Sequence, residues 1–272
     1  MNRMNAIAER FSRIPAVRAV VLGGSRATGT AGESSDLDIG IYYDRSLLDY
    51  EALNAAAQEI DDLRRPNLIC EEGGWGKWVN CGGWLTVGGT PTDLILRDFS
   101  RIQLAIADTD AGRVTAHYQT GHPHAFLNVM YRGELALCRP LFVRGAEFSA
   151  CKAHAEEYPE EMRRALLDLF GFEAGFSAEF VRKYAESGDL SYVAGHLFRG
   201  VSAMNQALFA WNRVYCLNEK RAVRRAAALP ASLPDYERRV GQAFALLGES
   251  PARSAAVFSE LAEELEALCR QP

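Results

Sequence analysis

The stretch VVLGGSRATGTAGESSDLDIGIYY, from Val20 to Tyr43, contains a short glycine segment followed by two aspartates. Just upstream and overlapping it, the β-branched apolar run from Val17 to Leu22 predicts a buried strand. Residues 23–35 are rich in turn-forming residues, and residues 36–43 predict a second strand. The stretch therefore predicts two strands that are joined by a glycine-containing turn.

The two aspartates are predicted to share one face of the second strand. Side chains alternate along a strand, so Asp36 and Asp38 point the same way and Leu37, Ile39 and Ile41 point the other way. The apolar set makes a core face, and the aspartates lie on the open face. Two carboxylates so close repel each other. A divalent cation relieves this repulsion, and hard oxygen ligands favour magnesium.

A phosphate-binding segment is predicted immediately upstream, where Gly23-Gly24-Ser25 follows the buried strand. Glycines let the backbone approach a ligand closely. If a helical turn begins at Ser25, its free N–H groups and its hydroxyl face an incoming anion. Phosphate on one side and carboxylates on the other would suit a metal–triphosphate site.

A third carboxylate is expected on a neighbouring strand, which is predicted over residues 92–97. Leu94 and Leu96 share one face of this strand, and Asp93 lies on the other face. This repeats the arrangement around Asp36 and Asp38. Three carboxylates could complete a site for two metal ions.

This combination of Gly-Gly-Ser, Asp-Leu-Asp and a distant strand aspartate resembles the DNA polymerase β-type nucleotidyltransferase superfamily. Within it, the chain is most similar to the bacterial branch of aminoglycoside and lincosamide nucleotidyltransferases. The resemblance implies an α+β fold, with a mixed β-sheet and flanking helices followed by a C-terminal all-α helical bundle. It implies a catalytic domain over residues 1–145 and a substrate-binding domain over residues 146–272.

The resemblance also implies roles for the motif residues. Asp36 and Asp38 would hold two magnesium ions, and Asp93 would complete the second site and help to deprotonate the acceptor. Gly24 and Ser25 would contact the β- and γ-phosphates of ATP, the expected donor. The acceptor hydroxyl would attack the α-phosphorus in line, and magnesium pyrophosphate would leave. The acceptor would be a small molecule, with an aminoglycoside- or lincosamide-like antibiotic as one candidate.

Five further side chains are candidates for binding, each with a structural alternative. Arg26 suits a phosphate contact and a surface ion pair equally. Lys220 is a triphosphate contact by resemblance, or else a solvated helix end. Glu173, on an apolar helical stripe, would bind a substrate amine or act as a second base, or else is a structural acid at a domain boundary. His196 and Arg199 would bind substrate in an interdomain cleft, or else lie on an exposed helix face.

Hydrophobic periodicity and breaking residues indicate the remaining elements. Residues 75–87 predict one or two strands. Helices are predicted over residues 5–13, 47–63, 101–118, 125–131, from Pro159 onward, 190–217, 238–247 and 255–268.

Composition narrows the class of partner. The formal net charge of -5, with neither half of the chain basic, argues against nucleic-acid binding. The six cysteines show no CxxC spacing, which suggests thiols in a reducing cytosol. The N-terminus has no secretory signal, and no apolar run is long enough to span a membrane. We therefore expect a cytoplasmic monomer or homodimer.

Two other functions are compatible with the motif. The acceptor could be a protein or a tRNA end, as in regulatory or toxin-like relatives, although the acidic balance weighs against tRNA. The chain could also be a catalytically silent nucleotide-binding module. Such modules usually lose one carboxylate, whereas Asp36, Asp38 and Asp93 are all present here. A P-loop would need the lysine of GxxxxGK[ST], which the glycine segment lacks.

Overall fold

A computed structural model describes residues 3–29, 32 and 35–270, which form two compact units. The sheet unit comprises Met1–Asp108, Gln119–Gly121 and Leu127–Glu157. The helical unit comprises Thr109–Tyr118, His122–Phe126 and Tyr158–Pro272. The sequence suggested one boundary after residue 145, whereas residues 146–157 belong to the sheet unit and two earlier segments belong to the helical unit.

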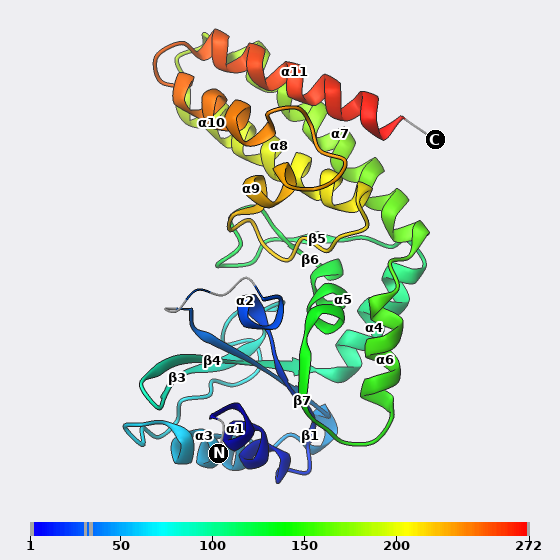
Figure 1. The fold of residues 1–272 in the computed structure, drawn as a ribbon. Helices are drawn as coiled ribbons and strands as arrows, with labels where there is room; N and C mark the ends of the chain where they lie inside the picture. Colours follow the sequence, from blue (N-terminus) through cyan, green and yellow to red (C-terminus); the bar gives the residue numbers. More distant parts are fainter. Residues whose placement is uncertain (1–2, 30–31, 33–34, 271–272) are drawn as a thin grey trace. The chain divides into compact units, whose positions relative to one another are not determined.

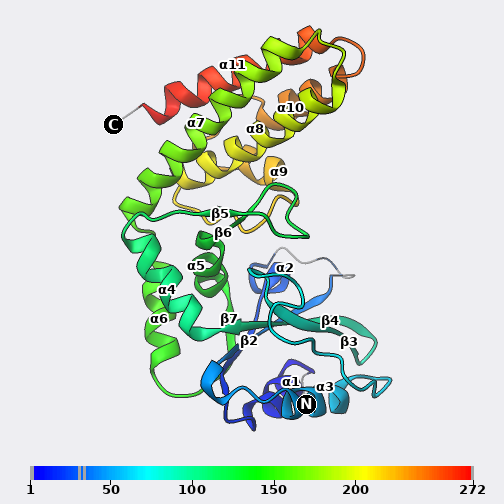
Figure 2. The same cartoon turned by 180° about the vertical axis from the view of Figure 1, so that it is seen from behind.

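The elements can be followed by label in Figure 1 and, from behind, in Figure 2. Their order up to the fourth helix is α1 (Arg3–Ser12), β1 (Val17–Leu22), α2 (Gly24–Ala27), β2 (Leu37–Tyr43), η1 (Arg45–Leu47), α3 (Tyr50–Ile60), β3 (Cys81–Val87), β4 (Thr90–Asp98) and α4 (Phe99–Asp110). Then come β5 (Ala116–His117), β6 (Phe126–Leu127), α5 (Asn128–Leu137), β7 (Arg139–Val143) and α6 (Glu147–Glu156). The chain ends in α7 (Glu160–Tyr184), α8 (Leu190–Trp211), α9 (Ala222–Ala227), α10 (Tyr236–Leu246) and α11 (Pro251–Cys269).

The predicted α+β class is confirmed. A five-stranded mixed sheet has the order β3-β4-β2-β1-β7, with β2 and β4 parallel and the other neighbours antiparallel. Helices flank this sheet, and the C-terminal region is helical. Among the described residues, every helix is too short or too polar to cross a bilayer.

The two faces of the sheet bury different side chains. Leu37, Ile39 and Ile41 of β2 join a core that includes Phe11 of α1 and Leu53 of α3, and Figure 1 shows both helices below the sheet. Burying each large apolar side chain contributes about 2 kcal/mol. The alternate residues of β2 face the other way, as predicted, and the aspartates are among them.

The opposite face is covered at the carboxyl ends of β2 and β4. Tyr42 packs edge to face on Phe148 of α6, with ring centroids 5.0 Å apart. Arg97 donates to Glu134 of α5 at 2.8 and 2.9 Å. These contacts cover the sheet four residues beyond Asp38 and Asp93, so the helices pack away from the aspartates.

Several predicted elements need correction. The helix expected over 101–118 ends at Asp110, because Gly112 adopts a left-handed φ of +68°, and residues 116–117 form β5. The helix expected over 125–131 begins only at Asn128. Of residues 75–87, only Cys81–Val87 form a strand. The predicted turn over residues 23–35 contains α2, and its residues 30–31 and 33–34 lie outside the described part.

Asp61 links the end of α3 to β3. Its fully buried carboxylate accepts from Nε of Arg65 at 2.9 Å, Nη2 of Arg65 at 2.7 Å and the backbone N–H of Thr86 at 3.0 Å. The Arg65 hydrogen bonds, aided by the Thr86 N–H, hold the pKa of Asp61 well below its usual range.

We expect Asp61→Ala to lower the free energy of unfolding by about 2–4 kcal/mol, because it removes the acceptor for Arg65 and for Thr86. Since the folded-state pKa is lowered, the stabilisation is present above the unfolded pKa and is lost as pH falls through the folded pKa. The difference between wild type and variant should therefore shrink under acid conditions. Urea unfolding at neutral and acid pH measures it, and a difference that is independent of pH would contradict this account.

Candidate active site

Asp38 and Asp93 lie opposite each other on adjacent strands. β2 and β4 run parallel, and their register pairs Asp38 with Asp93. Residues in register point to the same face, so both carboxylates lie on the face away from Leu37 and Leu94. Both aspartates are half-buried. The structure therefore brings together two side chains that are 55 residues apart in the sequence.

The charge of Asp36 also acts on this pair of aspartates. Burial raises the pKa of Asp93, and the negative charges of Asp38 and then Asp36 raise it further. Asp36 is exposed and lies one residue before β2 begins. The three predicted carboxylates thus form one region of negative potential, which disfavours further negative charge and favours a cation.

Gly24 packs directly against Asp38. Its φ is +58°, and a Cβ built on it would lie 1.8 Å from Oδ2 of Asp38. The N–H of Gly23 donates to the backbone oxygen of Asp38 at 2.8 Å. Only glycine allows this approach. The predicted phosphate-binding residues Gly24 and Ser25 therefore begin α2 beside the aspartate pair.

Arg26 has a role that neither sequence-based alternative included. Its Nε donates to the backbone oxygens of Ser35 at 3.2 Å and Asp36 at 3.1 Å, and its Nη2 donates to Ser35 at 2.5 Å. The side chain thus fixes the backbone that carries Asp36. Residue types cannot reveal a contact to backbone oxygens across a turn, which is why sequence reasoning missed it.

Asp38 and Asp93 are the side chains that could hold a magnesium ion at this site. Within the described part of the chain, no group of three or more His, Cys, Asp or Glu side chains is arranged to hold a metal ion. However, proteins usually bind Mg²⁺ through one or two carboxylates, and water and substrate phosphates complete the shell. The facing carboxylates of Asp38 and Asp93 fit that pattern. Asp36 as a further ligand, and the second ion, stay predictions.

The other predicted binding residues belong to the helical unit. Glu173 on α7 accepts from Nε2 of His124 at 3.1 Å and from Nε of Arg199 at 2.5 Å. Burial alone would raise the pKa of Glu173, but the hydrogen bond from His124 and the charge of Arg199 hold it below its usual range. The acid on the apolar stripe therefore has two partners. His124, 49 residues away, could not be identified from spacing.

His196 and Lys220 have different surroundings. The His196 ring stacks on Phe180, with centroids 5.0 Å apart, and burial followed by the charge of Arg199 lowers its pKa. Lys220 is exposed beside α9, and its backbone N–H donates to Oδ1 of Asn218 at 3.0 Å. The substrate-binding role of His196 and the triphosphate contact of Lys220 stay predictions.

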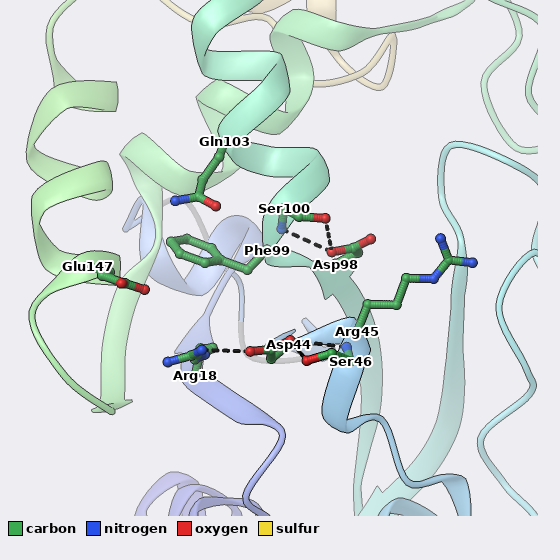
Figure 3. A pocket seen from close by; sticks show the side chains of 9 residues that line it. All are labelled: Arg18, Asp44, Arg45, Ser46, Asp98, Phe99, Ser100, Gln103 and Glu147. Atoms are coloured by element: carbon green, nitrogen blue, oxygen red, sulfur yellow. Dashed lines mark hydrogen bonds and ion pairs between the residues drawn. The ribbon is translucent and has the colours of Figure 1, made fainter.

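A cavity of about 460 Å³ lies at the other end of the same strands (Figure 3). It is roughly 17 Å along β2 from Asp38. Two of its three carboxylates serve local structure: Asp44 accepts from Nη2 of Arg18 at 2.6 Å, and Asp98 accepts from the N–H of Ser100 at 3.0 Å. Sequence reasoning did not single out this cavity.

The part of the chain that carries Asp36 and Asp38 is similar to a known family of domains. Residues 4–71 match the family model described as Nucleotidyltransferase domain. The match includes Gly24, Asp36 and Asp38 and ends before Asp93. It supports a transferase, with transfer of a nucleoside monophosphate as its general activity.

The crystal structure of a nucleotidyltransferase-like protein from Exiguobacterium sibiricum 255-15 aligns with a TM-score of 0.46 and 9% sequence identity. The alignment covers 96% of this chain and 72% of that chain. None of the curated proteins matches the sequence.

Proposed function

We propose that this protein transfers AMP from ATP to a hydroxyl of a small-molecule acceptor in a magnesium-dependent reaction. The main support for this proposal is the pairing of Asp38 with Asp93 on adjacent parallel strands. Gly24 also lies in contact range of the Asp38 carboxylate. Carboxylates beside exposed backbone N–H groups suit a metal–triphosphate complex. The nucleotidyltransferase match over residues 4–71 supports the same class of reaction.

Each residue of the site has its own proposed role. Asp38 and Asp93, with Asp36, would hold magnesium, which offsets negative charge on the attacking and leaving oxygens. The N–H groups at Gly24 and Ser25 would bind the β- and γ-phosphates, and Lys220 would add a triphosphate contact. The reaction forms a bond between the acceptor oxygen and the α-phosphorus and breaks the bond to the β-phosphate bridge, so pyrophosphate leaves.

Asp93 is proposed to receive the hydroxyl proton. Its position opposite Asp38 would keep it beside the metal-bound phosphate. We expect Asp93→Asn to slow transfer by at least about a hundredfold.

The acceptor is proposed to be a neutral or cationic alcohol, with aminoglycoside- and lincosamide-like antibiotics as the first candidates. The net charge of -5 supports a cationic molecule over a nucleic acid. Glu173, His196 and Arg199 would belong to its binding region. The six cysteines form no disulfide in the described part of the chain, which supports a reducing, cytoplasmic location.

Labelled ATP, magnesium and a panel of aminoglycosides and lincosamides provide the test. We expect an adenylylated acceptor and released pyrophosphate with the wild-type protein, and a strong reduction with Asp93→Asn. Label on proteins or tRNA in a lysate would instead favour a macromolecular acceptor. Turnover that is unchanged in Asp93→Asn would contradict the proposed site.

A further inference from the structure

One face of α7 has an unusual pattern within the helical unit. Asp168, Gly171, Gly175 and Arg182 follow one another at steps of three, four and seven residues, so they form a single stripe that is not buried in the subunit. The centre of the stripe consists of small residues, and its ends carry opposite charges. With α11, this face borders a groove of about 560 Å³.

The two glycines have no function inside the chain that the structure reveals. A Cβ at Gly171 or Gly175 would meet nothing within 4 Å, and both lie well inside a 25-residue helix. Glycine there makes the helix less stable than alanine would. Glycine in a helix allows another backbone to approach closely, and no described part of this chain makes that approach.

Aromatic rings flank the small residues. Phe172 is 72% exposed and Phe176 is 44% exposed, and their ring centroids are 5.9 Å apart. The large exposed rings project from the helix, and the adjacent glycines leave a shallow depression. A packing interface needs both features. Such a surface can pair with itself.

The charged residues at the two ends of the stripe can also pair with those of a second copy. Asp168 and Arg182 each lie seven residues from Gly175, in opposite directions. Both are exposed, and within the described part of the chain neither takes part in an ion pair. A two-fold axis through Gly175 relates antiparallel helices and would place Asp168 opposite Arg182 of the partner subunit, and the reverse.

We propose that this stripe is a homodimer interface, in which α7 of two copies pack antiparallel and cross at Gly175. Two symmetric Asp168–Arg182 pairs set the direction and register. Phe172, which is exposed on the flank of the stripe, packs on α7 of the partner subunit. The same surface serves both subunits, as a two-fold interface requires.

Charge-swap variants of the full-length chain test the register. We expect Asp168→Arg and Arg182→Asp each to raise the dimer dissociation constant by at least about tenfold, because like charges then face each other. The double variant restores opposite charges and should recover the wild-type constant. Sedimentation over a wide concentration range measures the dissociation constant of the wild type, the two single variants and the double variant. Glu237→Arg, at an exposed position of α10, is the matched control and should leave the constant unchanged.

Gly175→Gln tests the close approach. Open space at its Cβ predicts that the subunit folds with at least wild-type thermal stability, while the added side chain blocks the crossing. Dimerisation should weaken by at least about tenfold. The proposal is overturned if the wild-type chain is monomeric at all concentrations, if single and double swaps behave alike, or if the stripe binds only another protein.

Discussion

An Asp38→Asn variant is expected to lose nucleotidyl transfer by about a thousandfold, the largest effect predicted for any single substitution in this chain. The substitution keeps the size of the side chain but removes the charge that faces Asp93. Fold stability should be unchanged or slightly raised, because a repulsion between neighbouring carboxylates is relieved. Initial rates of adenylylated product, compared at matched thermal stability, measure the effect.

Asp49→Asn is the matched control for this substitution. Asp49 caps α3 through its side chain, and asparagine is an equally good cap, so both stability and activity should stay at the wild-type level. If Asp38→Asn retains activity within tenfold of wild type while Asp49→Asn behaves as expected, Asp38 does not hold the metal.

The second large effect is expected for Gly24→Ala. The new Cβ would overlap the Asp38 carboxylate, so that carboxylate must leave its position opposite Asp93. A displacement of about one ångström at a reacting centre can cost about a hundredfold in rate, and we expect at least that loss. The left-handed backbone should add a destabilisation of about 1 kcal/mol.

Gly145→Ala separates these two consequences. Gly145 has a similarly left-handed φ of +73°, but a Cβ there would meet nothing within 4 Å. This variant should share the loss of stability and retain full activity. Equal activity in Gly24→Ala and Gly145→Ala would show that contact with Asp38 does not matter for catalysis.

The sequence was sufficient where local pattern determines structure. Val17–Leu22 was predicted as a strand with the bounds of β1, and β2 and β4 were predicted to within two residues, because buried strands carry continuous or alternating apolar residues. The face that carries Asp38 followed from the same alternation. Its proximity to Asp93 was expected from the resemblance to the superfamily and not from alternation, and the residue-to-residue register comes from the structure, which places β4 beside β2.

The elements that the sequence failed to predict depend on contacts distant in the chain. β7 is an edge strand that contains Pro140, and its pairing with β1 is what makes it a strand. The long helix expected after Arg101 stops at Asp110, and the next residues instead join a two-stranded sheet. The contacts of Arg26 and of Glu173 likewise join residues whose proximity exists only in the folded chain.

A crystal structure with Mn²⁺ in place of magnesium and a nonhydrolysable ATP analogue would test the central claim most directly. We predict an anomalous peak bonded to the carboxylates of Asp38 and Asp93 and to phosphate oxygens, with the outer phosphates at the N–H groups of Gly24 and Ser25. A metal–nucleotide complex bound elsewhere, with these two carboxylates in contact with neither ion nor phosphate, would contradict the account.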